Sequence, residues 1–290
     1  MASFTNDDLL NLDREFAEQN IPLHARPFQA AVRILGPSFS IGPFRTSDGL
    51  EEITTAYRAL FPGSDFWPGA GQGLAASVDR VHLITMPVVS GPRTVDLHTG
   101  LGFADASEWR AWCRNDPEIA SKSAYAFADL HDLSYGLDSL PQNSEQHTYF
   151  HRSMQHLGDL SASLSNTGGT SDAALQNILL IAELALKGSL LQLGVPAKVL
   201  KDKFGHRLPE LARELAKVRP HHEDEELQRV CEKMPNLVAS RYGSSGLSRM
   251  QIVELAVASQ FIAASAMRRI SGADLALEVR RDGPRPSFHI

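Results

Sequence analysis

The sequence predicts an α+β N-terminal domain over residues 1–157, followed by an all-α bundle of roughly four or five helices over residues 174–272. A short β-branched stretch in the first half has the composition of a strand. Residues 158–173 are small, polar and rich in Gly, Ser and Thr, which is typical of a linker. The second half shows helical periodicity alone, and a chain of 290 residues is long enough for two domains.

The start of the chain is expected to be helical over about the first 60 residues. Thr5, with Asp8 three positions later, resembles a capping box that begins the first helix. Pro27 suits the first turn of a second helix, where its missing N–H costs nothing. Residues 62–76, PGSDFWPGAGQGLAA, are rich in Gly and Pro and lack the spacing of a phosphate-binding loop, so an ordinary loop is predicted.

The strand signal follows this loop, in RVHLITMPVV (80–89). The Ser-Gly-Pro sequence at 90–92 can turn the chain, and TVDLH (94–98) can pair back to complete a hairpin. Residues 106–134 return to a helical pattern, with Ser107 as the expected N-cap. The first half is therefore predicted to be α+β.

The second half is predicted to contain helices only. Residues 174–193 are apolar around most of the helix, so this helix is expected to be central and buried. A leucine-striped helix is expected near 206–218, and a third helix should begin after Pro220. A Ser-x-x-Gln capping box at 248–251 begins the last long helix. Residues 273–290 are expected to form a loose tail.

Composition and charge are typical of a globular protein and exclude few classes of function. The chain is 43% hydrophobic with a net charge of −6. Residues 1–170 carry 11 Lys and Arg against 20 Asp and Glu, whereas residues 171–290 carry 17 against 14. Neither half is basic enough to predict nucleic-acid binding from charge alone.

Cysteine usage and hydropathy indicate a cytoplasmic protein. Cys113 and Cys231 form neither a disulfide framework nor a zinc spacing, so two buried thiols in a reducing compartment are expected. The N-terminus lacks a basic region followed by an apolar one, which argues against a signal peptide. No apolar run approaches the roughly 18–20 residues that a membrane span needs, so no membrane is expected as a partner.

Three segments of the second half carry a resemblance to a known family. They are AELALKGSLLQLG (182–194), with its Glu and Lys, FGHRLPELARELAK (204–217), in which a Gly-His pair begins a helix, and RYGSSGLSRMQ (241–251). Together they resemble the HEPN superfamily of helical bundles, over about residues 174–270. The N-terminal half resembles no family in the same way.

The resemblance implies one of two activities. Many HEPN domains are metal-independent ribonucleases of toxin–antitoxin, abortive-infection and CRISPR-linked systems. In these an Arg is typically followed by a His after four to six intervening residues. Arg213 precedes His221 with seven residues between them, and Arg285 precedes His289 with three, and neither pair has that spacing. The pair that has it, Arg93 and His98, lies in the first half. Other HEPN domains lack the motif and act as binding modules.

The favoured interpretation is a HEPN-like binding protein for RNA, a nucleotide or a partner protein, in a prokaryotic defence or toxin–antitoxin setting. The expected ligand-binding residues are His206, Arg207, Arg241 and Tyr242. Arginine offers a planar fork of donors for phosphate, and tyrosine offers a ring on which a base can stack. The resemblance also implies a homodimer formed through the C-terminal helices.

Two alternatives remain open. In the first, the chain is a metal-independent ribonuclease in which Arg213 meets His221 or His222 across a dimer. In the second, it is a metal-dependent enzyme that uses His147 and His151, which share one face of a helix at i,i+4. No metal is expected at the run of His and acidic residues from 221 to 226, because neighbouring residues on a helix point about 100° apart. No cofactor is expected either.

Overall fold

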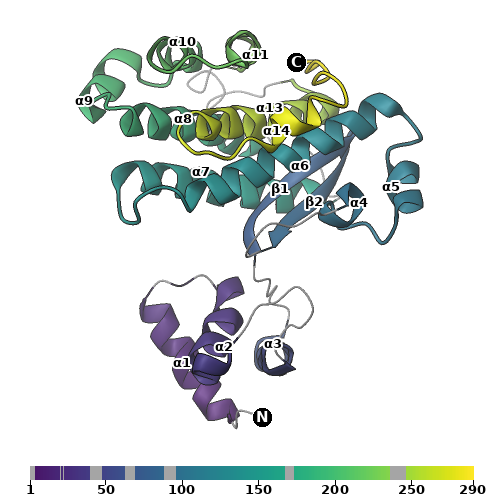
Figure 1. Cartoon of the computed structure of the whole chain (residues 1–290), viewed down its shortest axis with the longest axis vertical. Coiled ribbons are helices and arrows are strands. Elements are labelled where there is room, and N and C mark those ends of the chain that lie inside the picture. The colour runs from purple at the N-terminus through teal and green to yellow at the C-terminus, as the bar shows by residue number, and fades with distance from the viewer. Residues whose placement is uncertain are drawn as a thin grey trace. The chain divides into compact units, whose positions relative to one another are not determined.

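The computed structural model describes residues 4–19, 21, 23–39, 48–62, 69–87, 96–166, 173–235 and 246–290. These residues form many helices and one small two-stranded antiparallel sheet (Figure 1). A mostly helical chain with one small sheet agrees with the coarse prediction of an α+β arrangement together with a helical one. The chain divides into two compact units, one made of residues 1–70 with 87–94 and the other of residues 71–86 with 95–290.

The first unit is a small helical cluster. Its helices are α1 (Asn6–Glu18), η1 (Leu23–Ala25), α2 (Arg26–Leu35), η2 (Gly36–Ser38) and α3 (Asp48–Leu60). The capping box at the start of α1 is confirmed, since Asp8 N donates to Thr5 Oγ1 and Thr5 N donates to the Asp8 carboxylate. Pro27 lies in the first turn of α2, as predicted. Phe16 and Tyr57 are fully buried between the helices and form the centre of this core.

The sheet consists of β1 (Gly69–Ser77) and β2 (Arg80–Pro87). The strand predicted at 80–89 is confirmed over residues 80–87. Its predicted partner is wrong, because Leu97–Gly100 form helix α4 and residues 88–95 lie outside the described part of the chain. The partner strand is instead β1, whose residues were expected to be a loop.

The glycines of β1 explain that error. A Cβ atom on Gly71 would lie 2.6 Å from both Met154 Cε and Ser134 Oγ, and one on Gly73 would lie 2.5 Å from Gln260 Oε1. The strand therefore packs its backbone directly onto three helices, and here glycine marks close approach and not a loop. The Gln260 amide completes the contact, accepting from Leu74 N at 2.9 Å and donating to Leu74 O at 3.2 Å.

Helices make up most of the second unit. Besides α4, they are α5 (Ala106–Trp112), α6 (Pro117–Leu137), α7 (Glu145–Ser165), α8 (Ala173–Gln192), α9 (Ala197–Val199), the π-helical turn η3 (Leu200–Phe204), α10 (Leu208–Val218), α11 (Asp224–Lys233), α13 (Arg249–Arg268) and α14 (Leu275–Val279). The four longer helices predicted in the second half correspond to α8, α10, α11 and α13. The capping box at Ser248 and Gln251 is confirmed at the start of α13.

The single helix expected over residues 106–134 is instead two helices, α5 and α6. Arg114 and Asn115 adopt positive φ angles of 58° and 53° and turn the chain between them. The expected cap Ser107 is also wrong, since Asp105 caps α5 and accepts a hydrogen bond from Ser107 N at 2.7 Å.

The expected linker at 158–173 differs from the structure in its first half. Residues 158–165 continue helix α7, which packs along α8 (Figure 1). Ser153 and Ser161 are fully buried, and their hydroxyls donate to carbonyls of Ile181 and Leu157. Small polar residues here allow two helices to pack closely, which produces the same composition as a linker. Residues 167–172 lie outside the described part of the chain.

The centre of the second unit is built by α8 and α13, which pack against each other. Both are long and apolar enough to cross a membrane, although no apolar run of that length was expected from the sequence. Most of each helix is buried within the unit, as expected for the core helices of a soluble protein. The thiols of Cys113 and Cys231 are also buried, as predicted.

The C-terminal residues 273–290 are not the loose tail that was expected. After α14 the chain runs back over α6, where Tyr125 Oη donates to Gly283 O at 2.7 Å. Phe288 is 7% exposed, and the Arg285 guanidinium lies over the rings of Tyr125 and Phe261. Buried contacts hold this segment in place, and its polar, Pro-containing sequence did not predict them.

Candidate functional site

Glu183 on α8 is a buried carboxylate that holds two basic side chains. It is 5% exposed, its Oε1 accepts a hydrogen bond from Lys187 Nζ at 2.6 Å, and its Oε2 lies 2.8 Å from His206 Nδ1. A buried carboxylate needs such partners, because burial without them is costly. The contact between Glu183 and His206 joins segment 182–194 to segment 204–217, which are two of the three segments that carry the family resemblance.

The orientation of His206 follows from this contact. With Glu183 ionised, Nδ1–H donates to the carboxylate, which leaves the Nε2 lone pair of the neutral ring on the other side. The His206 side chain is 52% exposed, so the ring is fixed at one end and open to solvent. Gly205, with a φ of +57°, provides the left-handed turn that places His206 just before α10.

His206 belongs to an exposed group of cations that we call the basic corner. The group spans α9, η3 and the start of α10 and consists of Lys198, Lys201, Lys203, His206 and Arg207. The Arg207 guanidinium donates to the carbonyl oxygens of Lys203 and Phe204, so it also closes the end of η3. Two of its cations are ion-paired, since Lys203 Nζ lies 4.0 Å from Glu214 and Arg207 Nη1 lies 3.8 Å from Glu210. Residues 198–207 nevertheless hold four Lys and Arg against one acidic residue, Asp202, whereas the whole chain has a net charge of −6.

The other two residues expected to bind ligand, Arg241 and Tyr242, lie outside the described part of the chain. His206 and Arg207 are close to each other, as the sequence requires, and Glu183 and Lys187 were not among the expected site residues. Their i,i+4 spacing within an apolar helix was the signal that could have revealed them.

The residues of the expected ribonuclease set, Arg213, His221 and His222, are placed differently. Arg213 is exposed on α10, and its ion-pair partner is Glu232 at 3.9 Å. His221 and His222 lie in the turn before α11, with ring centroids 4.1 Å apart. Within one chain, none of the described contacts of Arg213 is with either histidine.

His221 and His222 lie before a helix and not on it, whereas the acidic residues after them form the helix start that was predicted. The two histidines precede α11, which begins at Asp224, so the 100° separation of neighbouring helical residues does not apply to them. Asp224 Oδ2 accepts a hydrogen bond from His221 N at 3.0 Å, and acidic residues fill the first turn, as predicted for a helix start. Burial, and then the charge of His221, lower the pKa of His222.

Beside this turn lies a buried arginine network that sequence reasoning missed. The Arg268 side chain has no exposed surface and reaches Asp129 at 2.5 Å, Asp132 at 2.7 Å and Glu223 at 2.9 Å. Arg285 donates to both oxygens of Asp129 at 2.7 Å. Burial opposes the charge on Arg268, but the three carboxylates outweigh it and raise its pKa well above the usual value. Charged residues inside apolar helical stretches were the available signal.

The third expected site is the pair His147 and His151 on α7. Their rings are parallel within 14° and their centroids lie 6.2 Å apart, so they share a helix face as predicted. Burial, and then the charge of His147, lower the pKa of His151. Among the described residues, the group of three metal-ligating side chains is His221, His222 and Asp274, and it does not include this pair.

No protein-family model, curated protein or solved structure matches the chain. Function is therefore inferred from the chemistry of these side chains together with the HEPN resemblance.

Proposed function

We propose that the chain is a HEPN-like binding protein that docks the phosphates of RNA or of a nucleotide on its basic corner. The observation that carries the proposal is the buried Glu183, which holds His206 in a fixed position within the segment that carries the exposed lysines. Side chains that are fixed before binding lose little conformational entropy when a ligand arrives. The exposed lysines add long-range attraction for a polyanion.

The wider setting follows the family resemblance. We propose a homodimer formed through the C-terminal helices, and a role in prokaryotic defence or a toxin–antitoxin system in which a partner protein could also bind. Arg241 and Tyr242 are proposed to complete the binding face, supplying a phosphate fork and a stacking ring.

Fluorescence anisotropy with a labelled mixed-sequence single-stranded RNA, and separately with a labelled nucleotide, tests the proposal. The variant Lys198→Ala/Lys201→Ala/Lys203→Ala should weaken RNA binding at least tenfold at low salt. It should also reduce the slope of log K against log salt by about two, since each phosphate contact to a single strand contributes about 0.7.

A charge-matched control uses exposed cations elsewhere in the same unit. The variant Lys217→Ala/Arg219→Ala/Lys233→Ala removes the same charge from α10 and α11 but leaves the basic corner intact. It should bind RNA nearly as tightly as the unmodified chain. Equal losses in the two variants would show that only net charge matters, and unchanged binding in the first would refute the proposal.

A second candidate is a metal-independent ribonuclease, and one observation favours it. A carboxylate that orients an exposed imidazole, as Glu183 orients His206, is an arrangement suited to general acid–base catalysis. It places the chemistry at His206 and not at Arg213, His221 or His222. RNA cleavage in EDTA that is abolished by His206→Ala would support this activity. If the RNA stays intact, the ribonuclease is ruled out and binding is the remaining candidate function.

A further inference from the structure

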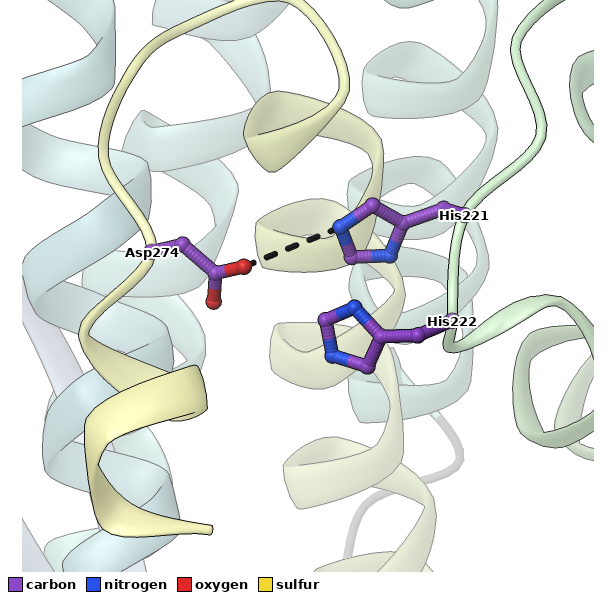
Figure 2. A group of neighbouring side chains, drawn as sticks. All are labelled: His221, His222 and Asp274. Carbon is purple, nitrogen blue, oxygen red and sulfur yellow. Dashed lines mark ion pairs between the residues drawn. The ribbon is translucent and has the colours of Figure 1, made fainter. Parts of the chain in front are cut away.

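His221, His222 and Asp274 come from two segments that are distant in the sequence and converge at one point (Figure 2). One ligand atom from each residue lies within 4.8 Å of the others, and His221 Nε2 is 3.7 Å from Asp274 Oδ2. That distance is too long for a hydrogen bond. It is close to the roughly 3.3 Å that separates two ligands of a tetrahedral metal ion bound at about 2.0 Å.

The backbone explains how two neighbouring histidines can face one point. They lie in the turn between α10 and α11, so their side chains are not spread around a helix. Asp224 fixes this turn by accepting from His221 N, and the Arg269 guanidinium holds Asp224 at 2.6 Å. The turn is therefore set before any ligand binds.

Asp274 presents one oxygen to the histidines while the other is occupied. Its Oδ1 caps α14 by accepting from Leu277 N at 3.0 Å and lies 3.5 Å from Arg268 Nε. This leaves Oδ2 directed at His221, as Figure 2 shows. A carboxylate held in this way can bind a metal through one oxygen without giving up its structural contact.

Behind His221 lies a second carboxylate. Glu223 Oε2 is 3.6 Å from His221 Nδ1, and Arg268 Nη1 donates to both Glu223 oxygens at 2.9 and 3.2 Å. A carboxylate behind a metal-bound imidazole fixes the tautomer whose other nitrogen is the ligand. Glu223 N–H also points at Nδ1, but at 3.4 Å this contact is weak. At 3.6 Å the Glu223 carboxylate is not hydrogen-bonded to Nδ1, so a metal on Nε2 would require the tautomer whose Nδ1–H faces Glu223.

We propose that His221, His222 and Asp274 bind one divalent transition-metal ion, with Zn²⁺ as the preferred ion. Two imidazole nitrogens and one carboxylate oxygen are the donors that such ions favour, whereas Mg²⁺ and Ca²⁺ take oxygen ligands. Three protein ligands leave a fourth position open. His222 also lines a cavity of about 170 Å³, whose other charged residues are Glu223, Glu226, Arg280 and Arg285, so a ligand could reach this position.

The test uses the full chain after dialysis against a chelator. Titration with Zn²⁺ by calorimetry should give one equivalent, and Co²⁺ should give the intense visible absorption of a tetrahedral site. His222→Ala removes an exposed ligand, and Asp274→Asn removes a ligand charge while an Asn can still cap α14. Each variant should weaken Zn²⁺ binding at least tenfold, with far-ultraviolet circular dichroism unchanged.

Two controls separate this site from the others. His206→Ala removes the histidine of the basic corner, and His147→Ala/His151→Ala removes the pair on α7, and both should bind Zn²⁺ as tightly as the unmodified chain. No saturable Zn²⁺ binding would overturn the proposal. So would binding that persists in His222→Ala and Asp274→Asn, or that is lost only with His147 and His151. RNA binding by the basic corner is measured separately, so the two proposals stand or fall independently.

Discussion

Arg268 Nε lies 2.7 Å from Asp132 Oδ2, and neither side chain has any exposed surface. The contact ties the C-terminal end of α13 to the middle of α6. Asp132 also accepts from the backbone N–H groups of Leu275 and Ala276, so it fixes the start of α14 as well. One carboxylate thus positions three elements, among them the segment that presents Asp274.

Removing one carboxylate of the arginine network should be strongly destabilising. Asp129→Asn keeps the shape but removes the charge that pairs with both Arg268 and Arg285. Arg268 keeps Asp132 and Glu223 as partners, so the cost is that of the charge-assisted hydrogen bonds lost at Asp129, each about 1.5–3 kcal/mol of unfolding free energy. Urea unfolding measures this loss. Glu278→Gln, in the exposed ion pair with Arg281, should cost less than about 1 kcal/mol and serves as the control.

Stability should fall in acid because of the same network. Burial raises the pKa of Asp132, but His131, Arg268 and the Leu275 N–H lower it more, and the net pKa lies below its ordinary value. The folded state therefore holds the ionised form more strongly than the unfolded state does. The stabilisation is complete above about pH 4, the ordinary Asp pKa, and is lost as the pH falls through the lower folded-state pKa.

Urea midpoints measured at pH 7, 5 and 3.5 test this dependence. The unmodified chain should lose stability mainly between the last two values, and Asp132→Asn should be less stable at pH 7 with a flatter profile. Asp282→Asn, at an exposed position near the C-terminus, should reproduce the unmodified profile. An equally steep acid loss in Asp132→Asn would assign the effect to other groups.

Adding one methyl group to the β1 strand should be costly. In Gly73→Ala the new Cβ would lie 2.5 Å from Gln260 Oε1 and 2.9 Å from a methyl carbon of Leu130, so buried helices must shift. Such overpacking costs about 1–3 kcal/mol. Gly272→Ala is the matched control, since a Cβ there meets nothing within 4 Å. Equal stability of the two variants by thermal unfolding would contradict the close packing of β1 on the helices.

The features that the sequence predicted well are local. The capping boxes at Thr5–Asp8 and Ser248–Gln251 each need two residues three positions apart, and both are present. The nature of β1 could not be predicted, because Gly73 is required by the approach of Gln260, which lies 186 residues from the Leu74 that it pairs with. A glycine in a loop and a glycine packed against a helix cannot be told apart in the sequence, because only the tertiary contact distinguishes them.

The same distinction holds for the candidate sites. Glu183 and His206 are 23 residues apart and both lie in segments that carried the resemblance, so their pairing was within reach of sequence reasoning. Asp274 was placed in a tail, and its approach to His221 depends on α14 being held by Asp132. Contacts that bring distant charged residues together were the part of the site that periodicity and spacing could not reveal.

The pairing of Glu183 with Lys187 can be tested by a double-mutant cycle. Glu183→Gln leaves the half-buried Lys187 ammonium without a charged partner, which should cost about 1–3 kcal/mol of unfolding free energy. Glu183→Gln/Lys187→Met removes both charges, and it should recover part of that loss because no buried charge is left unpaired. Urea unfolding of both variants and of Lys187→Met gives the coupling energy. Strict additivity would show that the carboxylate does not hold the lysine.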